Sequence, residues 1–387
     1  MLKMMSPRAL FAGALAAFVG FASSFAVVVQ GLRAVGASDA EAASGLMMLS
    51  IAMGLCGIVL SLKTRMPVSV AWSTPGAALL ASTGAVAGGF HSAVGAFLIS
   101  SLLLTLAGLW KPLSRLVERI PPTLANAMLA GILLHLCLAP VKAIAEMPAA
   151  GLIILIVWAI VGRIKRILAM PAAVLVTIGL IIFYSKSGIA LSSLMPMPVF
   201  VMPEFSLAAL VGMAVPLFIV TMASQNIPGM AVLSVNGFTP KAGPLIATTG
   251  VFSILAAPFG GHAVNLAAIT AAICAGPEAG HDPARRYMSA VTAGTLYVVF
   301  GLLAGGATAL IAIAPPILIE AVAGLALIGA FGSSLMAALS DTHQREAAII
   351  TFLVSASGLT LFGIGAAFWG LIAGGAMLAL QRLPIKS

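Results

Sequence analysis

Charged side chains are the scarcest feature of this 387-residue sequence, because only 7% of its residues are Asp, Glu, Lys or Arg. Soluble globular domains carry about 25%. With 61% apolar residues and a mean hydropathy of +1.17, the chain cannot cover a folded core with a water-compatible surface. This composition excludes a soluble enzyme, a nucleic-acid reader and a disordered scaffold, and it indicates a polytopic helical membrane protein. A β-barrel is excluded because the apolar runs do not alternate with polar residues.

Cysteine is scarce as well, and its placement excludes two kinds of chemistry. The three cysteines, Cys56, Cys137 and Cys274, all lie inside apolar runs. An odd set at these spacings gives neither a disulfide framework nor a metal-ligand pattern. We therefore expect no metal and no cofactor.

The few charges divide the chain into apolar stretches, and a helix needs about 20 residues to cross a bilayer. The first stretch follows Lys3 and Arg8 as a signal peptide would, but it lacks a convincing cleavage site, so we interpret it as the first helix. The three prolines of Pro196–Pro203 favour a loop or a short strand. Fourteen spans are predicted, at residues 9–31, 38–62, 70–84, 90–110, 121–138, 148–163, 167–184, 206–235, 243–258, 262–275, 285–309, 315–334, 344–359 and 363–382.

The net charge of +9 is explained by membrane orientation rather than by a nucleic-acid partner. If the N-terminus is cytoplasmic, the outside connectors hold only Arg33, Lys142 and Lys186 of the 19 basic residues. The other sixteen then lie inside, which agrees with the span count and predicts a multi-pass protein with both termini in the cytoplasm.

Fourteen spans suggest two sets of seven in opposite orientation, the inverted-repeat plan of many secondary transporters. Span 5 opens with Pro121-Pro122 and span 12 with Pro315-Pro316, while AMPAAVLVTIGL in span 7 aligns with GAAFWGLIAGGA in span 14. The third span of each half is short and has small, polar or helix-breaking residues near its start. A helix that begins at mid-membrane leaves its first N–H groups free to bind an anion.

The spans contain essentially no Asp, Glu, Lys or Arg, whereas a cation transporter normally places a carboxylate at mid-membrane. The cavity is therefore expected to be neutral to electropositive, which suits a monovalent organic anion. Ser73, Thr74, Pro75 and Gly76, beside Trp72, open span 3. They supply hydroxyl and N–H donors on a broken helix; the alternative is a proline kink whose hydroxyls cap their own backbone.

Two further polar clusters lie at membrane depth. Gly260-Gly261-His262 with Asn265 opens span 10; His262 is a proton-carrier candidate because histidine titrates near neutral pH, or else a structural helix cap. Ser224-Gln225-Asn226 lies within span 8, as part of the cavity or as helix–helix hydrogen bonders. Weaker candidates are Ser23, Ser24 and Gln30 in span 1, and His135, for which an interhelical hydrogen bond is favoured over a relay.

Four motifs carry a family resemblance: AWSTPGAALL (71–80), PLFIVTMASQNIPGM (216–230), AAITAAICAGPEAG (267–280) and SASGLTLFGIGAAFWGLIAGG (355–375). They resemble the benzoate/proton symporter family of BenE type over nearly the whole chain. The resemblance implies uptake of benzoate or a similar aromatic carboxylate across the bacterial cytoplasmic (inner) membrane, with benzoate and protons as the transported partners. A homodimer is the candidate assembly.

The resemblance also implies the nucleobase-transporter-like fold of the uracil/proton symporters, an all-α 7+7 inverted repeat with half-length spans 3 and 10 led in by short strands. Its core parts would be residues 1–119 and 204–312, and its gate parts residues 120–186 and 313–387. Carried onto this sequence, the binding residues would be Ser73, Thr74, Pro75 and Gly76 from span 3, Gly261, His262 and Ala263 from span 10, and Ser224, Gln225 and Asn226 from span 8, together with span 1, where Ser23 and Ser24 lie.

One departure from the fold's nucleobase carriers separates the hypotheses. Those carriers place glutamates on spans 8 and 10, where this chain has Ser224 or Gln225 and His262. A carboxylate would repel benzoate, so the change argues against nucleobases. It also removes the obvious proton carrier, so the co-transported proton would be carried either by His262 or by benzoate itself, crossing as the neutral acid. The alternatives are a nucleobase or small-anion carrier of the same fold, and an intramembrane enzyme, for which the sequence has no DxxD, HExxH or GxSxG-with-acid pattern.

Overall fold

The computed structural model describes residues 6–110, 112, 121–184, 195–362 and 364–381. Within these ranges, eight helices are long and apolar enough to cross a membrane, or nine if the pair at Pro283–Leu302 and Ala304–Ile313, bent by 53°, forms one span. The chain is therefore a mostly helical, polytopic membrane protein. A helix lies within each of the fourteen predicted segments, but the number of crossings stays a prediction. Several charged residues used to predict the topology lie outside the described ranges: Lys3, Lys111, Arg115, Glu118, Arg119, Lys186, Arg382 and Lys386.

The N-terminal half runs from α1 to α10 and contains one strand. Its elements are α1 (Pro7–Ala22), α2 (Phe25–Ala34), α3 (Asp39–Thr64), β1 (Val70–Trp72), α4 (Thr74–Thr83), α5 (Gly89–Leu109), α7 (Pro122–Cys137), α8 (Ala139–Glu146), α9 (Pro148–Ile164) and α10 (Ala169–Tyr184).

The C-terminal half also has a strand followed by a short helix, and its η4 and η5 are π-helices. Its elements are α11 (Leu207–Ala209), η4 (Leu210–Ala214), α12 (Val215–Thr221), η5 (Met222–Asn226), α13 (Ile227–Val235), α14 (Ala242–Ala256), η6 (Ala257–Phe259), β2 (Val264–Leu266), α15 (Ile269–Ala275), η7 (Pro277–Ala279), η8 (Pro283–Arg285), α16 (Tyr287–Leu302), α17 (Ala304–Ile313), α18 (Pro316–Ala338), α19 (Arg345–Ala356) and α20 (Ala366–Gln381). The proline-rich residues 195–206 before α11 form no helix or strand, as predicted for a loop.

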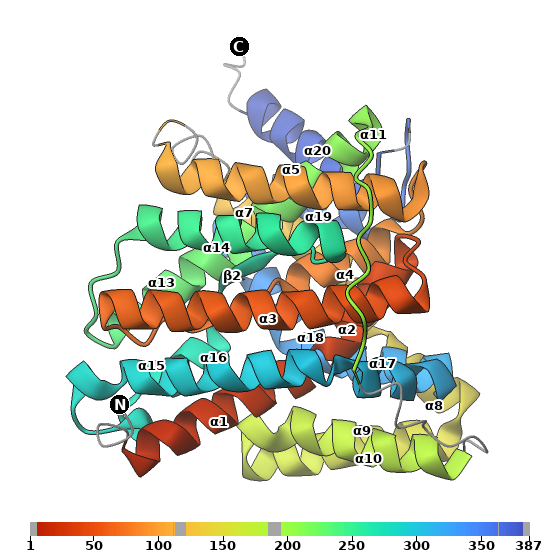
Figure 1. The fold of residues 1–387 in the computed structure, drawn as a ribbon. Coiled ribbons are helices and arrows are strands. Elements are labelled where there is room, and N and C mark those ends of the chain that lie inside the picture. Colours follow the sequence, from red (N-terminus) through yellow and green to blue (C-terminus); the bar gives the residue numbers. More distant parts are fainter. Residues whose placement is uncertain (1–5, 111, 113–120, 185–194, 363, 382–387) are drawn as a thin grey trace.

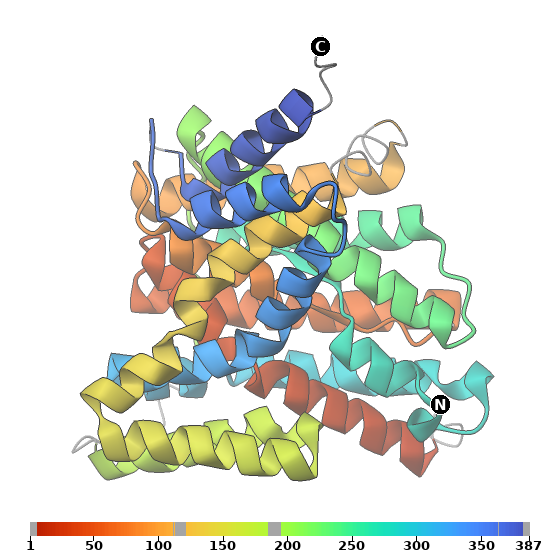
Figure 2. The same ribbon diagram turned by 180° about the vertical axis from the view of Figure 1, so that it is seen from behind.

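The helices separate into two groups. In the first, α3 packs along α16, α14 along α5, α1 along α16 and α2 along α4. In the second, α7 packs against α18 and α19, α19 against α20, and α9 against α10. The long helices α3, α5 and α16 of the first group lie in front in Figure 1, and the view from behind in Figure 2 brings α7 and α18 of the second group forward.

Strands β1 and β2 are antiparallel and buried, with Val70 opposite Leu266, Ala71 opposite Asn265, and Trp72 opposite Val264. Two flanking bonds lengthen the ladder: the Ser73 N–H donates to the Ala263 carbonyl, and the Ala267 N–H to the Ser69 carbonyl, both at 3.0 Å. Unpaired backbone groups are costly in a membrane interior, so this pairing lets extended chain exist there.

The predicted helix start at residue 262 is wrong. Gly260 has a φ of +90° and forms a turn, residues 264–266 form the strand, and α15 begins only at Ile269. Gly261, His262 and Ala263 therefore precede the strand and do not form the helix end. The Gly-Gly pair does mark a break in the helix. The backbone that follows the pair first forms β2 against β1, and only then begins α15.

Close helix packing in the first group depends on glycine at the α3–α16 crossing. A Cβ added to Gly54 would lie 2.5 Å from the Gly294 carbonyl oxygen, and one added to Gly294 would lie 2.6 Å from the Gly54 carbonyl oxygen. Small residues that let two backbones approach are typical of membrane helix pairs.

We expect Gly54→Val to separate α3 from α16 and to destabilise the fold by about 1–3 kcal/mol, the usual range for overpacking. Gly375→Val in α20 is the matched control, because a Cβ there meets nothing within 4 Å. The measurement is the loss of monodisperse protein on heating in detergent. Equal melting temperatures for the two variants would contradict the expected close packing.

Candidate functional site

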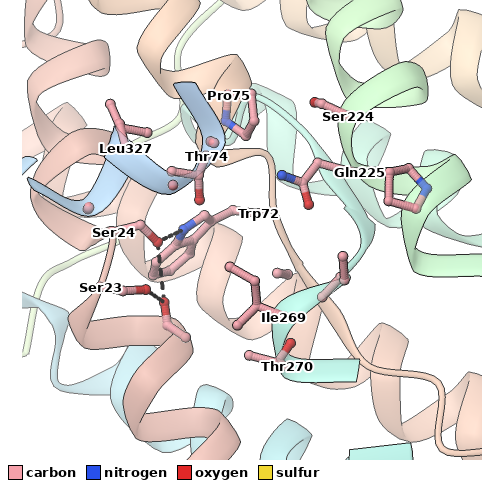
Figure 3. Close-up of a pocket in the computed structure, with 18 of the residues that line it drawn as sticks. Ser23, Ser24, Trp72, Thr74, Pro75, Ser224, Gln225, Ile269, Thr270 and Leu327 are labelled. Atoms are coloured by element: carbon pink, nitrogen blue, oxygen red, sulfur yellow. Dashed lines mark hydrogen bonds between the residues drawn. The ribbon is translucent and has the colours of Figure 1, made fainter. Parts of the chain in front are cut away.

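A cavity of about 500 Å³ lies between the two helix groups (Figure 3). Its volume is in the range of small-molecule sites. One wall comes from the α1–α2 break, the starts of α4 and α15, and the middle of the segment from α12 to α13. The opposite wall comes from α7 and α18. No Asp, Glu, Lys or Arg is among the described residues that line it.

The first helix is broken at the cavity. Helix α1 ends at Ala22 and α2 begins at Phe25, and the Ser23 and Ser24 hydroxyls both donate to the Gly20 carbonyl, at 3.3 and 3.2 Å. The buried Trp72 indole donates to the Ser24 Oγ at 2.8 Å (Figure 3). The break is thus fixed to strand β1, and both serines line the cavity.

The start of α4 combines a buried cap with two residues that line the cavity. The Ser73 Oγ accepts from the Gly76 N–H at 3.1 Å and from the Thr221 hydroxyl at 3.0 Å, and Ser73 is fully buried. Thr74 and Pro75 line the cavity, whereas Ser73 and Gly76 do not. The Thr74 hydroxyl has no hydrogen-bond partner among the described residues, so it can serve a ligand.

Gly76 acts as a spacer behind the wall. A Cβ there would lie 2.6 Å from the Leu217 Cδ1 and 2.8 Å from the Ser73 Oγ. The glycine therefore allows α4 to pack closely against α12, and its side of the helix faces away from the cavity.

The eighth predicted span widens into a π-helix, η5, at the polar triplet. Such bulges are frequent at functional sites. Ser224 and Gln225 line the cavity; the Ser224 hydroxyl donates to the Val220 carbonyl at 2.5 Å, and the Gln225 amide has no partner among the described residues. Figure 3 shows the Gln225 amide directed toward Thr74 and Trp72.

Asn226 supports strand β2 and does not line the cavity. Its side chain is fully buried, and its Oδ1 accepts from the Leu266 N–H at 2.9 Å. The Ser253 Oγ does the same for the Val264 N–H at 2.8 Å. These two side chains satisfy strand N–H groups that would otherwise be unpaired inside the membrane.

His262 also lies behind the wall. Its ring is fully buried and packs edge-on against the Phe97 ring, with 6.3 Å between the ring centroids. The Nε2 bonds to the Ser73 carbonyl at 2.9 Å. Because a carbonyl can only accept, this bond places a proton on Nε2. The Nδ1 is buried and has no hydrogen-bond partner among the described residues. Neither His262 nor its neighbours Gly261 and Ala263 line the cavity.

The contribution of the second half comes instead from Ala267, Ala268, Ile269 and Thr270, which sequence reasoning missed. No side chain caps α15 at Ala268. The Thr270 hydroxyl bonds to Ser69 at 2.7 Å, and both fix the start of the helix. A signal was available: Pro122 and Pro316 are separated by 194 residues, and the same offset carries Ser73–Gly76 onto 267–270.

Other wall residues carry no motif at all. Tyr297 lines the cavity from α16 and donates to the Ala16 carbonyl at 3.2 Å. The α7–α18 wall is small and largely apolar, with polar side chains only at Asn126, Ser333 and Ser334 among the described residues. These residues are isolated polar or small positions in apolar helices, which is why no pattern identified them.

Three other expectations have definite outcomes. His135 bonds to the Ala356 carbonyl at 2.8 Å and so links α7 to α19, which confirms the predicted interhelical bond. Gln30 is absent from the wall. The near-absence of acids within helices needs a correction, because Glu320 lies in the second turn of α18, half-buried and away from the cavity wall.

A family model and two curated relatives match nearly the whole chain. A family model described as benzoate membrane transport protein matches residues 3–380. The chain is 40% identical over 383 residues to the inner membrane protein YdcO of Escherichia coli, covering 97% of this chain and 96% of YdcO. It is 32% identical over 370 residues to a benzoate membrane transport protein of Acinetobacter baylyi, covering 95% and 94% of the two chains.

Solved structures show a shared fold at low sequence identity. The transmembrane domain of the cyanobacterial bicarbonate transporter BicA matches with a TM-score of 0.56 at 16% identity, over 97% of this chain and 96% of that one. The murine anion transporter Slc26a9 in its inward-facing state matches with a TM-score of 0.61 at 13% identity, over 97% and 68%.

The positions of Ser73 and Thr74 predict different effects for two neighbouring substitutions. Ser73→Ala removes a buried cap and should destabilise the protein by about 1 kcal/mol, seen as a lower melting temperature in detergent. Thr74→Val removes only a hydroxyl that faces the cavity and should leave the melting temperature within error. A larger loss of stability for Thr74→Val than for Ser73→Ala would contradict this assignment.

Proposed function

Because the chain belongs to the benzoate membrane transport protein family, we propose that it carries benzoate or a related aromatic carboxylate across the bacterial inner membrane by alternating access. The chain is a membrane transporter and not an enzyme, as its family shows. The observation that carries the substrate proposal is a cavity with polar donors on one wall, an apolar remainder and no acidic side chain among its described residues.

The carboxylate end of the proposed substrate is assigned to the first turn of α4. The Thr74 hydroxyl and the Gln225 amide are donors without protein partners among the described residues, and the positive end of the α4 dipole lies beside them. The start of α15, which has no side-chain cap, lies on the same wall. Such donors favour an anion and leave a nucleobase without the carboxylates that would accept its ring N–H groups.

The ring of the proposed substrate is assigned to the apolar surface of the cavity. Trp72 and Tyr297 supply aromatic surface, Ile269 and Leu327 supply aliphatic surface, and α18 presents small residues such as Ala330. A planar apolar ring loses little by leaving water for such a site. Bicarbonate and sulfate have no apolar part to use this surface.

The proposed architecture is a 7+7 inverted repeat of fourteen spans. It is supported by a common offset, since Val70 and Val264, which begin the two strands, and Pro122 and Pro316, which begin α7 and α18, are both separated by 194 residues. The proposed core parts are 1–119 and 204–312, and the gate parts 120–186 and 313–387. Their support is the separation of the described helices into two groups with the cavity between them. Both termini are proposed to be cytoplasmic, and the assembly to be a homodimer.

The proposed coupling to protons has two routes. In one, His262 carries the proton at Nδ1, the nitrogen without a partner, and transmits its charge to the start of α4 through Ser73. In the other, the substrate brings its own proton and crosses as the neutral acid. The burial of His262 away from the wall is more easily reconciled with the second route.

Uptake into proteoliposomes tests the substrate. When the outside of the vesicles is more acidic than the lumen, labelled benzoate should accumulate inside; vesicles with the opposite pH gradient are the control. Substituted benzoates should compete with the uptake, whereas uracil, sulfate, bicarbonate and aliphatic acids should not. Thr74→Val combined with Gln225→Leu should raise the half-saturating concentration roughly ten- to a hundredfold, since hydrogen bonds to a charged group contribute about 1.5–3 kcal/mol.

Thr295→Val on α16 is the matched control, because its exposed hydroxyl bonds only to the Val291 carbonyl of its own helix. Displacement by uracil or sulfate at benzoate-like concentrations would overturn the substrate class. Unchanged affinity in the double variant would remove α4 and η5 from the site.

The two coupling routes are separated by His262→Gln. If His262 carries the coupled proton, this variant should lose accumulation driven by the pH gradient and keep benzoate exchange at equilibrium. If the substrate carries the proton, both activities should persist at near wild-type rates. Normal accumulation by a folded His262→Gln protein therefore eliminates the histidine route.

A further inference from the structure

The gate wall of the cavity carries a polar patch that a plain benzoate ring would not use. The patch consists of Asn126 on α7 and of Ser333 and Ser334 on α18, and all three residues line the cavity. The carboxylate end of the site is already supplied from the other wall, by α4 and η5. An apolar ring facing this wall needs only apolar surface, so polar groups there call for a different explanation.

The three residues lie toward the same end of the wall. Helices α7 and α18 pack in opposite directions: Gly324 in the first half of α18 meets Leu136 near the end of α7 and Pro140 at the start of α8, while Ala127 packs against Ala338. Asn126 in the second turn of α7 therefore lies toward the same end of the wall as the last two turns of α18, which carry Ser333 and Ser334.

The patch also has hydrogen-bonding capacity to spare. The Asn126 Nδ2 donates to the Pro122 carbonyl at 2.8 Å, which leaves the amide oxygen and a second N–H. The hydroxyls of Ser333 and Ser334 bond to no protein group among the described residues. A ligand group facing the patch can thus find both a donor and an acceptor.

The cavity has room for such a group. A cavity of roughly 150 Å³ lined by apolar side chains binds benzene, whereas this one measures about 500 Å³. A benzoate held at α4 would leave free space toward α7 and α18. This free space is bordered by polar side chains as well as apolar ones.

From this combination we infer that the preferred substrate is an aromatic carboxylate with a hydroxyl or amino group on its ring, at a position away from the carboxylate. The ring substituent hydrogen-bonds to Asn126 and Ser333 while the carboxylate stays at Thr74 and Gln225. The inference rests on the proposed function, because it assumes that an aromatic carboxylate occupies this cavity. It adds a second recognition point, on the gate wall.

The test compares three ligands of graded chemistry on the purified full-length protein in lipid nanodiscs: benzoate, 4-methylbenzoate and 4-hydroxybenzoate. The methyl compound matches the hydroxyl compound in size but cannot hydrogen-bond. We expect 4-hydroxybenzoate to bind roughly tenfold more tightly than 4-methylbenzoate, about what one hydrogen bond contributes. Binding is measured by calorimetry, and uptake competition in proteoliposomes repeats the ranking.

Variants then assign the preference to the patch. Asn126→Leu combined with Ser333→Ala should abolish the hydroxyl preference and leave benzoate affinity within a few-fold of wild type. Ser340→Ala is the matched control. Ser340 follows the end of α18 and does not line the cavity, and its hydroxyl bonds to the Ala337 carbonyl. Melting temperatures establish that each variant is folded, and Ser333→Ala alone replaces the double variant if that protein is unstable.

Each outcome has a definite meaning. Equal affinity for the hydroxyl and methyl compounds in the wild type would overturn the inference and leave the proposed function intact. A preference that persists in the variants would remove the patch from recognition. If none of the three acids binds, the proposed function itself fails, and the inference fails with it.

Discussion

The pairing of β1 with β2 is the interaction on which the site depends. Lipid offers no partners for backbone N–H and C=O groups, so extended chain can exist at membrane depth only if another segment satisfies it. Here each strand satisfies the other, Asn226 and Ser253 satisfy outward N–H groups of β2, and the flanking bonds at Ser73 and Ala267 extend the ladder. Because the chain is held there, α4 and α15 can start inside the protein and present their first turns to the cavity.

The two walls of the cavity divide the work of recognition. The wall built on the strands is rich in donors, and it is fixed by bonds that leave little freedom, such as the Trp72 indole on Ser24 and the Ser73 cap on α4. The wall built on α7 and α18 carries mostly small side chains, with Leu129 and Leu327 as its larger apolar residues. In the proposed transport cycle, a rigid polar site moving against a smooth surface meets few obstacles, because small side chains interlock little.

Apolar runs and charge spacing predicted where the helices lie, because both follow directly from the cost of placing charge in lipid. The same reasoning placed Ser23, Thr74, Ser224 and Gln225 at membrane depth, and all four line the cavity. It misjudged His262, since a three-residue strand is too short to show a period of two, and a Gly-Gly break resembles a helix start. It missed Ala267–Thr270 because the start of α15 has no capping residue to announce it.

The alanine at position 267 has an evolutionary meaning if the two halves arose by duplication. In the first half, Ser73 caps its own helix and so uses up one of the free donors at that end. At the corresponding place of the second half stands Ala267, followed by the N-cap residue Ala268, and neither side chain can accept a hydrogen bond, so the donors that follow have no side-chain competitor. Divergence of that kind turns two equivalent helix starts into one whose N–H donors are partly used by a structural cap and one whose N–H donors remain available.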